Sequence, residues 1–296
     1  MPPLPSCILA LAVSLGSAGV AAGQSGVRRP ELVWRPSVPL QGSLVLLVVL
    51  SEGTDGVDAV QGELAGEPLH FERAAGGFRA VGGVPLDAED SVPARVVIER
   101  AGGMSDTMIA ALPVGPRRAP RERLHTAPEF VQPAESLAER IRAERELVEE
   151  VRSRAHATPR LWSEPFLRPR AALVTSGFGA ARVFNGVVRS RHFGVDFAGQ
   201  QGAAVRAANR GVVAFVADLY YSGTAVYLDH GAGLVTGYLH LSRALVIPGD
   251  TVARGQLIGN VGASGRVTGP HLHWLAGYGG VTVDPLDLLT IENLRW

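Results

Sequence analysis

Short apolar segments separated by glycine-rich turns fill the first third of the chain. Residues 44–50 are uniformly apolar, and residues 94–99 and 108–112 form shorter, mostly apolar stretches. A turn cluster at residues 101–103 separates two of these segments. Short apolar strands between tight turns are typical of antiparallel sheets. We therefore expect an N-terminal β-sandwich-like domain over residues 31–115.

The middle of the chain changes from a linker composition to a helical pattern. Pro and Arg residues are concentrated between Gly115 and Pro133, as in extended linkers. Between Ala134 and Arg154, apolar residues recur at helical spacing. This stripe consists of Leu137, Ile141, Leu147, Val148 and Val151. We expect residues 116–170 to form a Pro- and Arg-rich linker and a connecting helix.

Strand-length segments between tight turns return in the last part of the chain. The expected strands include Gly211–Ala217, Thr224–Asp229, Leu234–Leu241 and Gln256–Val261. The pattern predicts an antiparallel β-sheet domain over residues 171–296. The fold class is therefore expected to be mainly β, with this C-terminal antiparallel sheet domain, the sandwich-like domain and the connecting helix.

The N-terminus has the pattern of a cleaved export signal. An apolar run from Ile8 to Ala22 ends in small residues, although no basic residue precedes it. Ser17 and neighbouring glycines dilute the run, which argues against a membrane-spanning anchor. We expect residues 1–23 to be a signal peptide, leaving an exported protein, periplasmic or extracellular, with no transmembrane anchor. Because Cys7 is the only cysteine, no disulfide is expected in the mature chain.

The charge composition excludes several classes of function. The 28 basic and 28 acidic residues cancel to a formal net charge of +0, so no general basic field attracts nucleic acid. All the basic residues are Arg. The absence of Lys excludes Schiff-base catalysis and a biotinyl or lipoyl carrier, which the hairpin at residues 248–259 otherwise resembles.

Five of the eight histidines lie between residues 192 and 273. His192 and Asp196 are four residues apart, about 13 Å in an extended strand, so the chain must curve if both reach one ion. Gly194 between them permits such a bend. His271 and His273 are two residues apart, which places both imidazoles on one face of a strand, about 7 Å apart.

A further histidine belongs to the expected strand Leu234–Leu241. Alternation places Thr236, Tyr238 and His240 on one face, and Val235, Leu239 and Leu241 on the other. A polar row that ends in His240 predicts a strand at the floor of a reactive cleft. Two imidazoles and one carboxylate form the ligand set of a catalytic zinc site, and further histidines supply proton transfer. The spacing alone does not decide which histidines bind the metal.

These motifs together resemble the lysostaphin-type zinc metallopeptidases, also called LytM-like peptidases, a family of peptidoglycan hydrolases. The resemblance covers about residues 173–289. It is carried by Ser176-Gly177-Phe178-Gly179, His192-Phe193-Gly194-Val195-Asp196, Asp229-His230-Gly231, Gly237-Tyr238-Leu239-His240-Leu241-Ser242, Pro248-Gly249-Asp250, Gly255-Gln256-Leu257-Ile258-Gly259 and Thr268-Gly269-Pro270-His271-Leu272-His273-Trp274.

The resemblance implies a role for each residue of the site. His192, Asp196 and His273 would bind Zn²⁺. His240 and His271 would form the catalytic pair, which activates the water and stabilises the tetrahedral oxyanion. The resemblance therefore makes the C-terminal domain a zinc metallopeptidase domain.

Four other residues near these motifs have less definite roles. We expect His230 to be structural. Tyr238 either contacts substrate or packs within the sheet. Asn185 and Arg189 precede the first expected ligand and could line the cleft.

The function implied by the resemblance is zinc-dependent endopeptidase hydrolysis of peptide cross-links in bacterial peptidoglycan, in association with the cell wall. Its partners would be peptide stems or cross-bridges. The alternative is a non-catalytic, metal-holding regulator, or a wall-binding activator of cell-wall amidases; the complete set of ligand and catalytic positions favours the enzyme. The sandwich-like domain is expected to be a binding or spacer module.

Three points stay open at this level. The bond that is cleaved, the oligomeric state, and the coverage of the cleft by the linker or helix cannot be derived from these patterns. We also expect a fragment that begins near Arg160 to fold and bind zinc by itself.

Overall fold

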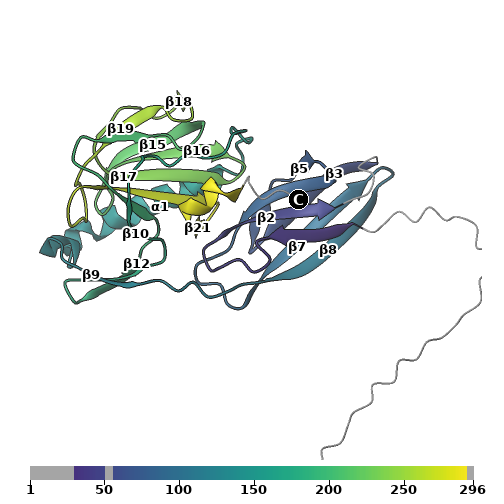
Figure 1. The fold of residues 1–296 in the computed structure, drawn as a ribbon, viewed down its shortest axis with the longest axis horizontal. Helices are drawn as coiled ribbons and strands as arrows, with labels where there is room; N and C mark the ends of the chain where they lie inside the picture. The colour runs from purple at the N-terminus through teal and green to yellow at the C-terminus, as the bar shows by residue number, and fades with distance from the viewer. Residues whose placement is uncertain (1–29, 51–55, 292–296) are drawn as a thin grey trace, which may run out of the picture.

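Two β-rich bodies lie side by side in the computed structural model, which describes residues 30–50 and 56–291 (Figure 1). The prediction of a mainly β fold is confirmed. The expected signal peptide, residues 1–23, lies outside the described residues. Within the described part of the chain, no helix has the length and apolar character needed to cross a membrane.

The first body is the expected sandwich of two antiparallel sheets. One sheet has the order β1 (Glu31–Arg35), β2 (Leu44–Leu50), β6 (Gly77–Gly83) and β5 (Glu72–Ala74). The other has the order β4 (Glu67–Leu69), β3 (Val57–Leu64), β7 (Ser91–Arg100) and β8 (Met104–Pro113). Alternating side chains of both sheets meet in a common apolar core.

Strand β2 is buried on both faces, which explains why its sequence is continuously apolar. Val45, Leu47 and Val49 point into the sandwich core. The alternate residues Leu44, Leu46 and Val48 belong to the large core of the second body. The sandwich therefore shares apolar packing with the C-terminal sheet.

Polar contacts reinforce this shared packing. Arg117 donates a hydrogen bond from Nη1 to Asp284 Oδ2 at 2.9 Å, and both side chains are largely buried. The Tyr278 hydroxyl donates to the carbonyl of Pro68 at 2.6 Å. A fragment that begins near Arg160 would lose these contacts and expose the apolar surface that β2 covers. The structure therefore leads us to expect that the two bodies unfold together.

The second body is built on one large antiparallel sheet, in agreement with the prediction. Its main path has the order β10 (Val174–Ser176), β13 (Val195–Ala198), β20 (His271–Tyr278), β17 (Leu234–Ala244), β16 (Gly223–Gly231), β15 (Gly211–Leu219) and β18 (Thr251–Val252). Three strands lie off this path: β21 (Val281–Val283) pairs with β20, β19 (Leu257–Val261) pairs with β17, and β14 (Ala204–Arg206) pairs with β19. A 3-10 turn, η3 (Pro285–Leu289), follows β21.

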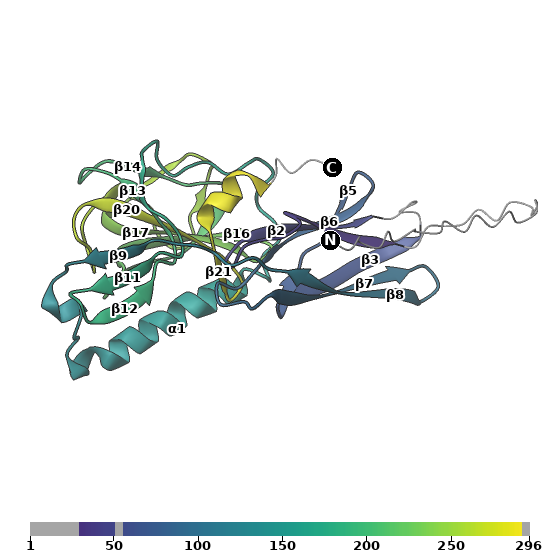
Figure 2. The ribbon, with the colours of Figure 1, turned by 60° about the horizontal axis from the view of Figure 1, so that its bottom comes forward.

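The expected helix is present as α1 (Ala138–Arg154), preceded by the 3-10 turns η1 (Pro128–Phe130) and η2 (Glu135–Leu137). It runs along the second body (Figure 2). Val151 and the following Ala155 pack against β15, β16 and β17. Leu147, which the predicted stripe places on the buried side, is 37 % exposed, so the prediction is wrong for this residue.

The linker segment contains a strand that its composition did not predict. Strand β9 (Arg121–Leu124) pairs in parallel with β11 (Ala181–Phe184), which also pairs with β12 (Val188–Arg191). This small sheet lies beside the large one (Figure 2). The linker is thus built into the second body.

Replacing Leu46 by Ala should destabilise the whole protein, because Leu46 is 5 % exposed and belongs to the core that both bodies share. We expect a loss of about 2–5 kcal/mol in the free energy of unfolding and a single unfolding transition. Chemical denaturation followed by fluorescence and circular dichroism measures both. Ile109→Ala is the matched control, since Ile109 is 79 % exposed on β8. Two separate transitions, with only one displaced by Leu46→Ala, would contradict the shared core.

Candidate metal centre and cleft

The three expected metal ligands meet because β13 pairs with β20. In this antiparallel pairing Asp196 lies directly opposite His273. His192 precedes β13, and the chain curves so that its imidazole returns toward Asp196. A Cβ atom on Gly194 would lie 2.5 Å from both His273 Nε2 and the carbonyl oxygen of Trp274. Glycine is therefore required here for close approach to β20 rather than for an unusual bend.

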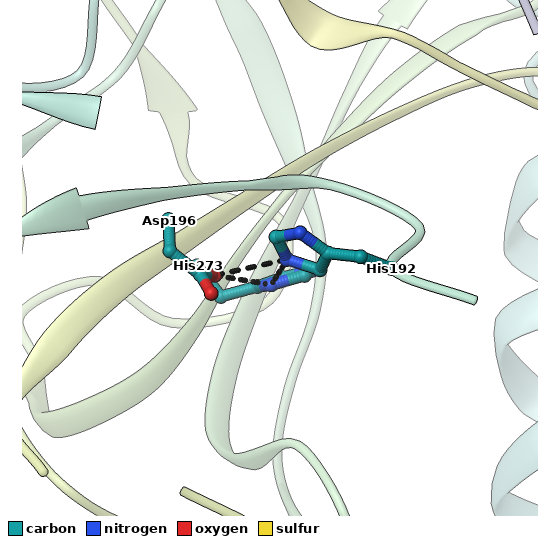
Figure 3. A group of neighbouring side chains, drawn as sticks. All are labelled: His192, Asp196 and His273. Atoms are coloured by element: carbon teal, nitrogen blue, oxygen red, sulfur yellow. Dashed lines mark hydrogen bonds and ion pairs between the residues drawn. The ribbon is translucent and has the colours of Figure 1, made fainter. Parts of the chain in front are cut away.

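The ligand atoms form a compact triangle (Figure 3). His192 Nε2 lies 2.9 Å from His273 Nδ1 and 3.0 Å from Asp196 Oδ1. His273 Nδ1 lies 2.8 Å from the same oxygen. All three side chains are buried. Within the described residues this is the one group of His, Cys, Asp and Glu side chains that can hold a metal ion.

Hydrogen bonding determines which nitrogen of His192 faces the triangle as an acceptor. His192 Nδ1 lies 2.8 Å from the carbonyl oxygen of Gly177, which can only accept a hydrogen bond, so Nδ1 carries the proton. In the neutral ring, Nε2 then presents a lone pair toward Asp196 and His273. Such a buried group of acceptors is stabilised by a cation at its centre.

The donor set fits Zn²⁺. Two imidazole nitrogens and one carboxylate oxygen, without cysteine, are typical of catalytic zinc sites that keep a position open for water or substrate. The carbonyl partner of His192 Nδ1 is the outer contact that zinc-binding histidines usually have.

The electrostatics of Asp196 favour an ionised carboxylate. Burial alone would raise its pKa, but hydrogen bonds and charge interactions with His192 and His273 outweigh burial and lower it. Burial lowers the pKa of His273 to about 4, against an opposing effect of Asp196.

Arg182 of β11 holds the other oxygen of Asp196, a contact that the sequence analysis missed. Its Nη2 donates to Asp196 Oδ2 and, at 2.8 Å, to Ser176 Oγ, while its Nε donates to Glu122 Oε2 at 2.9 Å. Oδ1 of Asp196 is thereby left to face the two imidazoles. Glu122 comes from β9, and the pairing of Glu122 with Arg182 across β9 and β11 could not be read from the linker composition.

The two expected catalytic histidines lie beside this triangle. The ring centroid of His240 is 5.0 Å from that of His271 and 5.7 Å from that of His273. His271 Nε2 lies 3.6 Å from Asp196 Oδ1. Both Nδ1 atoms donate to backbone carbonyls at 2.8 Å, His240 to Ser264 and His271 to Gly269. When such a ring carries its proton on Nδ1 alone, Nε2 is free to accept a proton.

The backbone of β17 changes direction at His240, where φ is 61°. The His240 N–H leaves the ladder and donates to the carbonyl of Ser222 at 2.9 Å. After this irregularity Leu241 packs in the same core as Tyr238, whereas Val235 and Leu239 pack under helix α1. The prediction that Leu241 shares a face with Val235 and Leu239 is therefore wrong, because regular alternation stops at His240.

Burial lowers the pKa of His240 well below its usual range, and the neighbouring His273 and His271 lower it further. This imidazole is therefore uncharged near neutral pH.

A cleft of about 570 Å³ opens beside these residues. Asp196, His240 and His271 line it, together with Arg182 and the loop at residues 266–270. The linker contacts one wall of the cleft, at Val267. Thr126 donates its N–H to Asn185 Oδ1 at 3.0 Å and its hydroxyl to the carbonyl of Val267 at 3.3 Å.

The remaining candidate residues lie away from the cleft. Tyr238 is fully buried, and its hydroxyl accepts hydrogen bonds from the N–H of Ala208 and the hydroxyl of Thr236. It is therefore part of the core, the second of its two predicted roles. Asn185 and Arg189 line a groove on the opposite side of the β9–β11–β12 sheet.

His230 is fully buried and bonded within the core. Its Nδ1 donates to the carbonyl of Arg210 at 2.7 Å, and its Nε2 lies 2.8 Å from the hydroxyl of Thr236. Burial lowers the pKa of His230 to about 4. These contacts agree with the structural role expected from the sequence.

We expect acidification to lower the free energy of unfolding because His230 becomes protonated. A histidine whose pKa is depressed on folding stabilises the native state above its unfolded pKa of about 6.5, and that stability is lost as the pH falls toward 4. His230→Gln should therefore reduce the loss of unfolding free energy between pH 7 and pH 5 by about 2 kcal/mol. Denaturant titrations at the two pH values measure this difference. Replacing the exposed His125 by Gln is the control. An equal loss of unfolding free energy between pH 7 and pH 5 in both variants would refute the structural role of His230.

Metal affinity should separate ligands from the other histidines. We expect Asp196→Asn and His273→Ala to lower the affinity for zinc by more than about 100-fold. Replacing a residue that only contacts a ligand usually lowers the affinity less than this. His240→Ala should keep the metal, because its Nε2 is not part of the triangle. Competition with a chromophoric chelator measures these affinities. Tight zinc binding by Asp196→Asn, or its loss in His240→Ala, would show that the ligands are assigned wrongly.

Comparison with known proteins agrees with this geometry. The model of Peptidase family M23 matches residues 190–285. The peptidoglycan DD-endopeptidase ShyC of Vibrio cholerae is 39% identical over 114 residues, 38% of this chain and 26% of that protein. ShyA, a peptidoglycan DD-endopeptidase of the same organism, is 48% identical over 83 residues, 28% of this chain and 19% of that protein. The chain thus matches about a quarter or less of the length of these relatives.

One solved structure resembles nearly the whole molecule. It is a protein of Pseudomonas aeruginosa assigned to peptidase M23, with a TM-score of 0.62 and 28% sequence identity, covering 86% of this chain and 96% of that chain. The resemblance therefore extends over the sandwich as well as the cleft. Together with the family match, it confirms the family resemblance drawn from the sequence motifs. We conclude that the chain contains a peptidase family M23 domain, over residues 190–285.

Proposed function

We propose that the protein is a zinc-dependent endopeptidase that hydrolyses peptide cross-links of bacterial peptidoglycan. The observation that carries the proposal is the triangle of His192, Asp196 and His273 at 2.8–3.0 Å, beside two histidines whose Nε2 atoms are free to accept protons. The names of the relatives support peptidoglycan as substrate and a bond between D-amino acids as its target.

His192, Asp196 and His273 would hold the zinc ion. When bound, zinc polarises the scissile carbonyl and lowers the pKa of a water molecule. Arg182 holds Asp196 Oδ2 and so keeps Oδ1 directed at the metal position. The carbonyl of Gly177 holds His192 with Nε2 directed at the same position.

His240 and His271 would manage the proton and the developing charge. Each has Nδ1–H fixed by a backbone carbonyl, so Nε2 can accept the proton of the attacking water. The same nitrogen, once protonated, can stabilise the tetrahedral oxyanion and return a proton to the leaving amine. The two rings are 5.0 Å apart by centroid, so one can accept a proton while the other donates a hydrogen bond.

The proposed substrate places the protein outside the cytoplasm, in contact with the cell wall. The export signal expected at residues 1–23 supports this location. The sandwich would keep the catalytic sheet rigid through the core that β2 shares with it.

Digestion of purified peptidoglycan tests the proposal. The wild-type protein should release muropeptides, and their masses identify the bond that is broken. His240→Ala should lower the rate about 100- to 10,000-fold, the usual cost of losing a general acid or base. Arg145→Gln, at an exposed position of α1, serves as the control. If the zinc-loaded wild type releases nothing, the proposal fails, and a non-catalytic regulator that holds metal becomes the better interpretation.

A further inference from the structure

The small β12–β11–β9 sheet has two chemically different faces. Paired residues on neighbouring strands share a face, and successive residues alternate. One face carries Glu122 and Arg182, which are paired across β9 and β11 and line the catalytic cleft. The register places a different set on the other face: Arg121 and Arg123 of β9, Ala181 and Val183 of β11, and Arg189 and Arg191 of β12. The separation is not complete, because Arg123 also borders the cleft, and Glu122 and Arg182 also border the groove on this second face.

The second face is a groove with arginines along both sides, which we call the arginine face. It encloses about 1010 Å³, and its floor is formed by Ala181 and Val183. Its four arginines, Arg121, Arg123, Arg189 and Arg191, are exposed. The pairing sets Arg121 across from Arg191, and Arg123 across from Arg189. The Cα atoms of these arginines are thus about 7 Å apart along a strand and about 10 Å apart across the groove.

The arginine face concentrates positive charge in a chain with no net charge. Among the described residues, none of its four arginines forms an ion pair, and Arg191 only donates to the carbonyl of Gly179 at 3.3 Å. Three exposed arginines of α1 differ, since Arg140, Arg142 and Arg154 each pair with a glutamate of the same helix. Like charges closer together than about 10 Å repel each other at moderate salt, so an anion between them stabilises the face.

We propose that the arginine face binds the carboxylates of peptidoglycan peptides, as a second contact with the polymer behind the catalytic cleft. This inference rests on the proposed function, because that function supplies the polymer. Guanidinium groups bind carboxylates through two parallel hydrogen bonds. Two opposed rows of arginines fit a chain that carries several carboxylates, whereas a single small anion would contact only one or two of them.

The position of the face supports the same partner. Its strands are those that hold Arg182 and Glu122 at the cleft. Polymer bound on the outer side therefore lies one sheet thickness from the metal centre. In a cross-linked network, such a contact keeps neighbouring peptides within reach of the cleft and raises their local concentration.

Co-sedimentation with insoluble peptidoglycan, freed of phosphate-containing polymers, tests the inference. All proteins carry His240→Ala, so retention does not depend on hydrolysis. The test variant adds Arg121→Gln and Arg189→Gln, which lie outside the catalytic cleft. The control adds Arg95→Gln and Arg145→Gln at exposed positions elsewhere. These substitutions remove the same amount of positive charge. Thermal unfolding verifies that both variants are folded.

We expect the test variant to bind about tenfold more weakly than the control, through the loss of two charge-assisted contacts. The affinity of the control for peptidoglycan should stay within about twofold of that of the parent protein, which carries His240→Ala alone, at the same salt concentration. Converting the peptidoglycan carboxylates to amides should lower the affinity of the parent protein by a similar factor. It should also abolish the difference in affinity between the test variant and the control. Equal binding of test and control, or binding that amidation does not change, would overturn the inference.

The two proposals fail in different ways. Arginine-dependent retention without muropeptide release by the wild type would reject hydrolysis and support the arginine face. Muropeptide release by the wild type, with equal retention of test and control, would reject the arginine face alone. Retention that only phosphate-containing wall polymers restore would also overturn it, because the ligand would then not be a carboxylate.

Discussion

The antiparallel register of β13 and β20 is the constraint on which the candidate metal centre depends. It places Asp196 opposite His273, and the same alternation sends Val195, Phe197, Leu272 and Trp274 into the large core. A shift by one residue would exchange the two faces and lose both the core and the site. The burial of these apolar side chains therefore holds three acceptor atoms close together, an arrangement that costs free energy until a cation binds.

Segments before the M23 domain take part in the same arrangement. Glu122 of the linker strand β9 positions Arg182, which in turn holds the carboxylate of Asp196. Strand β2 covers the opposite end of the large core with Leu44, Leu46 and Val48. The linker and the sandwich are thus coupled to the site through contacts.

Much of the architecture was predictable because it depends on local patterns. The apolar run of β2, the strand-length segments between tight turns that form β15 and β16, and the helical stripe before Arg154 each identified an element that the structure contains. The spacing of His192, Asp196, His271 and His273 identified side chains that the fold brings together, because strand periodicity places alternate residues on one face.

The features that were missed depend on contacts between distant segments or on unusual backbone geometry. Strand β9 is formed by its parallel partner β11, so the composition of residues 121–124 did not reveal it. The ion pair of Arg182 with Asp196 follows from that same pairing. The positive φ of His240, rare outside glycine, broke the alternation predicted for β17 and moved Leu241 to the other core.

We propose that His192, Asp196 and His273 hold a zinc ion with a position left open. X-ray absorption spectroscopy at the zinc edge of the full-length protein tests it most directly. We expect two imidazole nitrogens and oxygen donors at about 2.0–2.2 Å from the zinc ion, with no sulfur. Three or more imidazoles around the metal would contradict it, because His240 or His271 would then be a ligand and could not accept the proton of the attacking water.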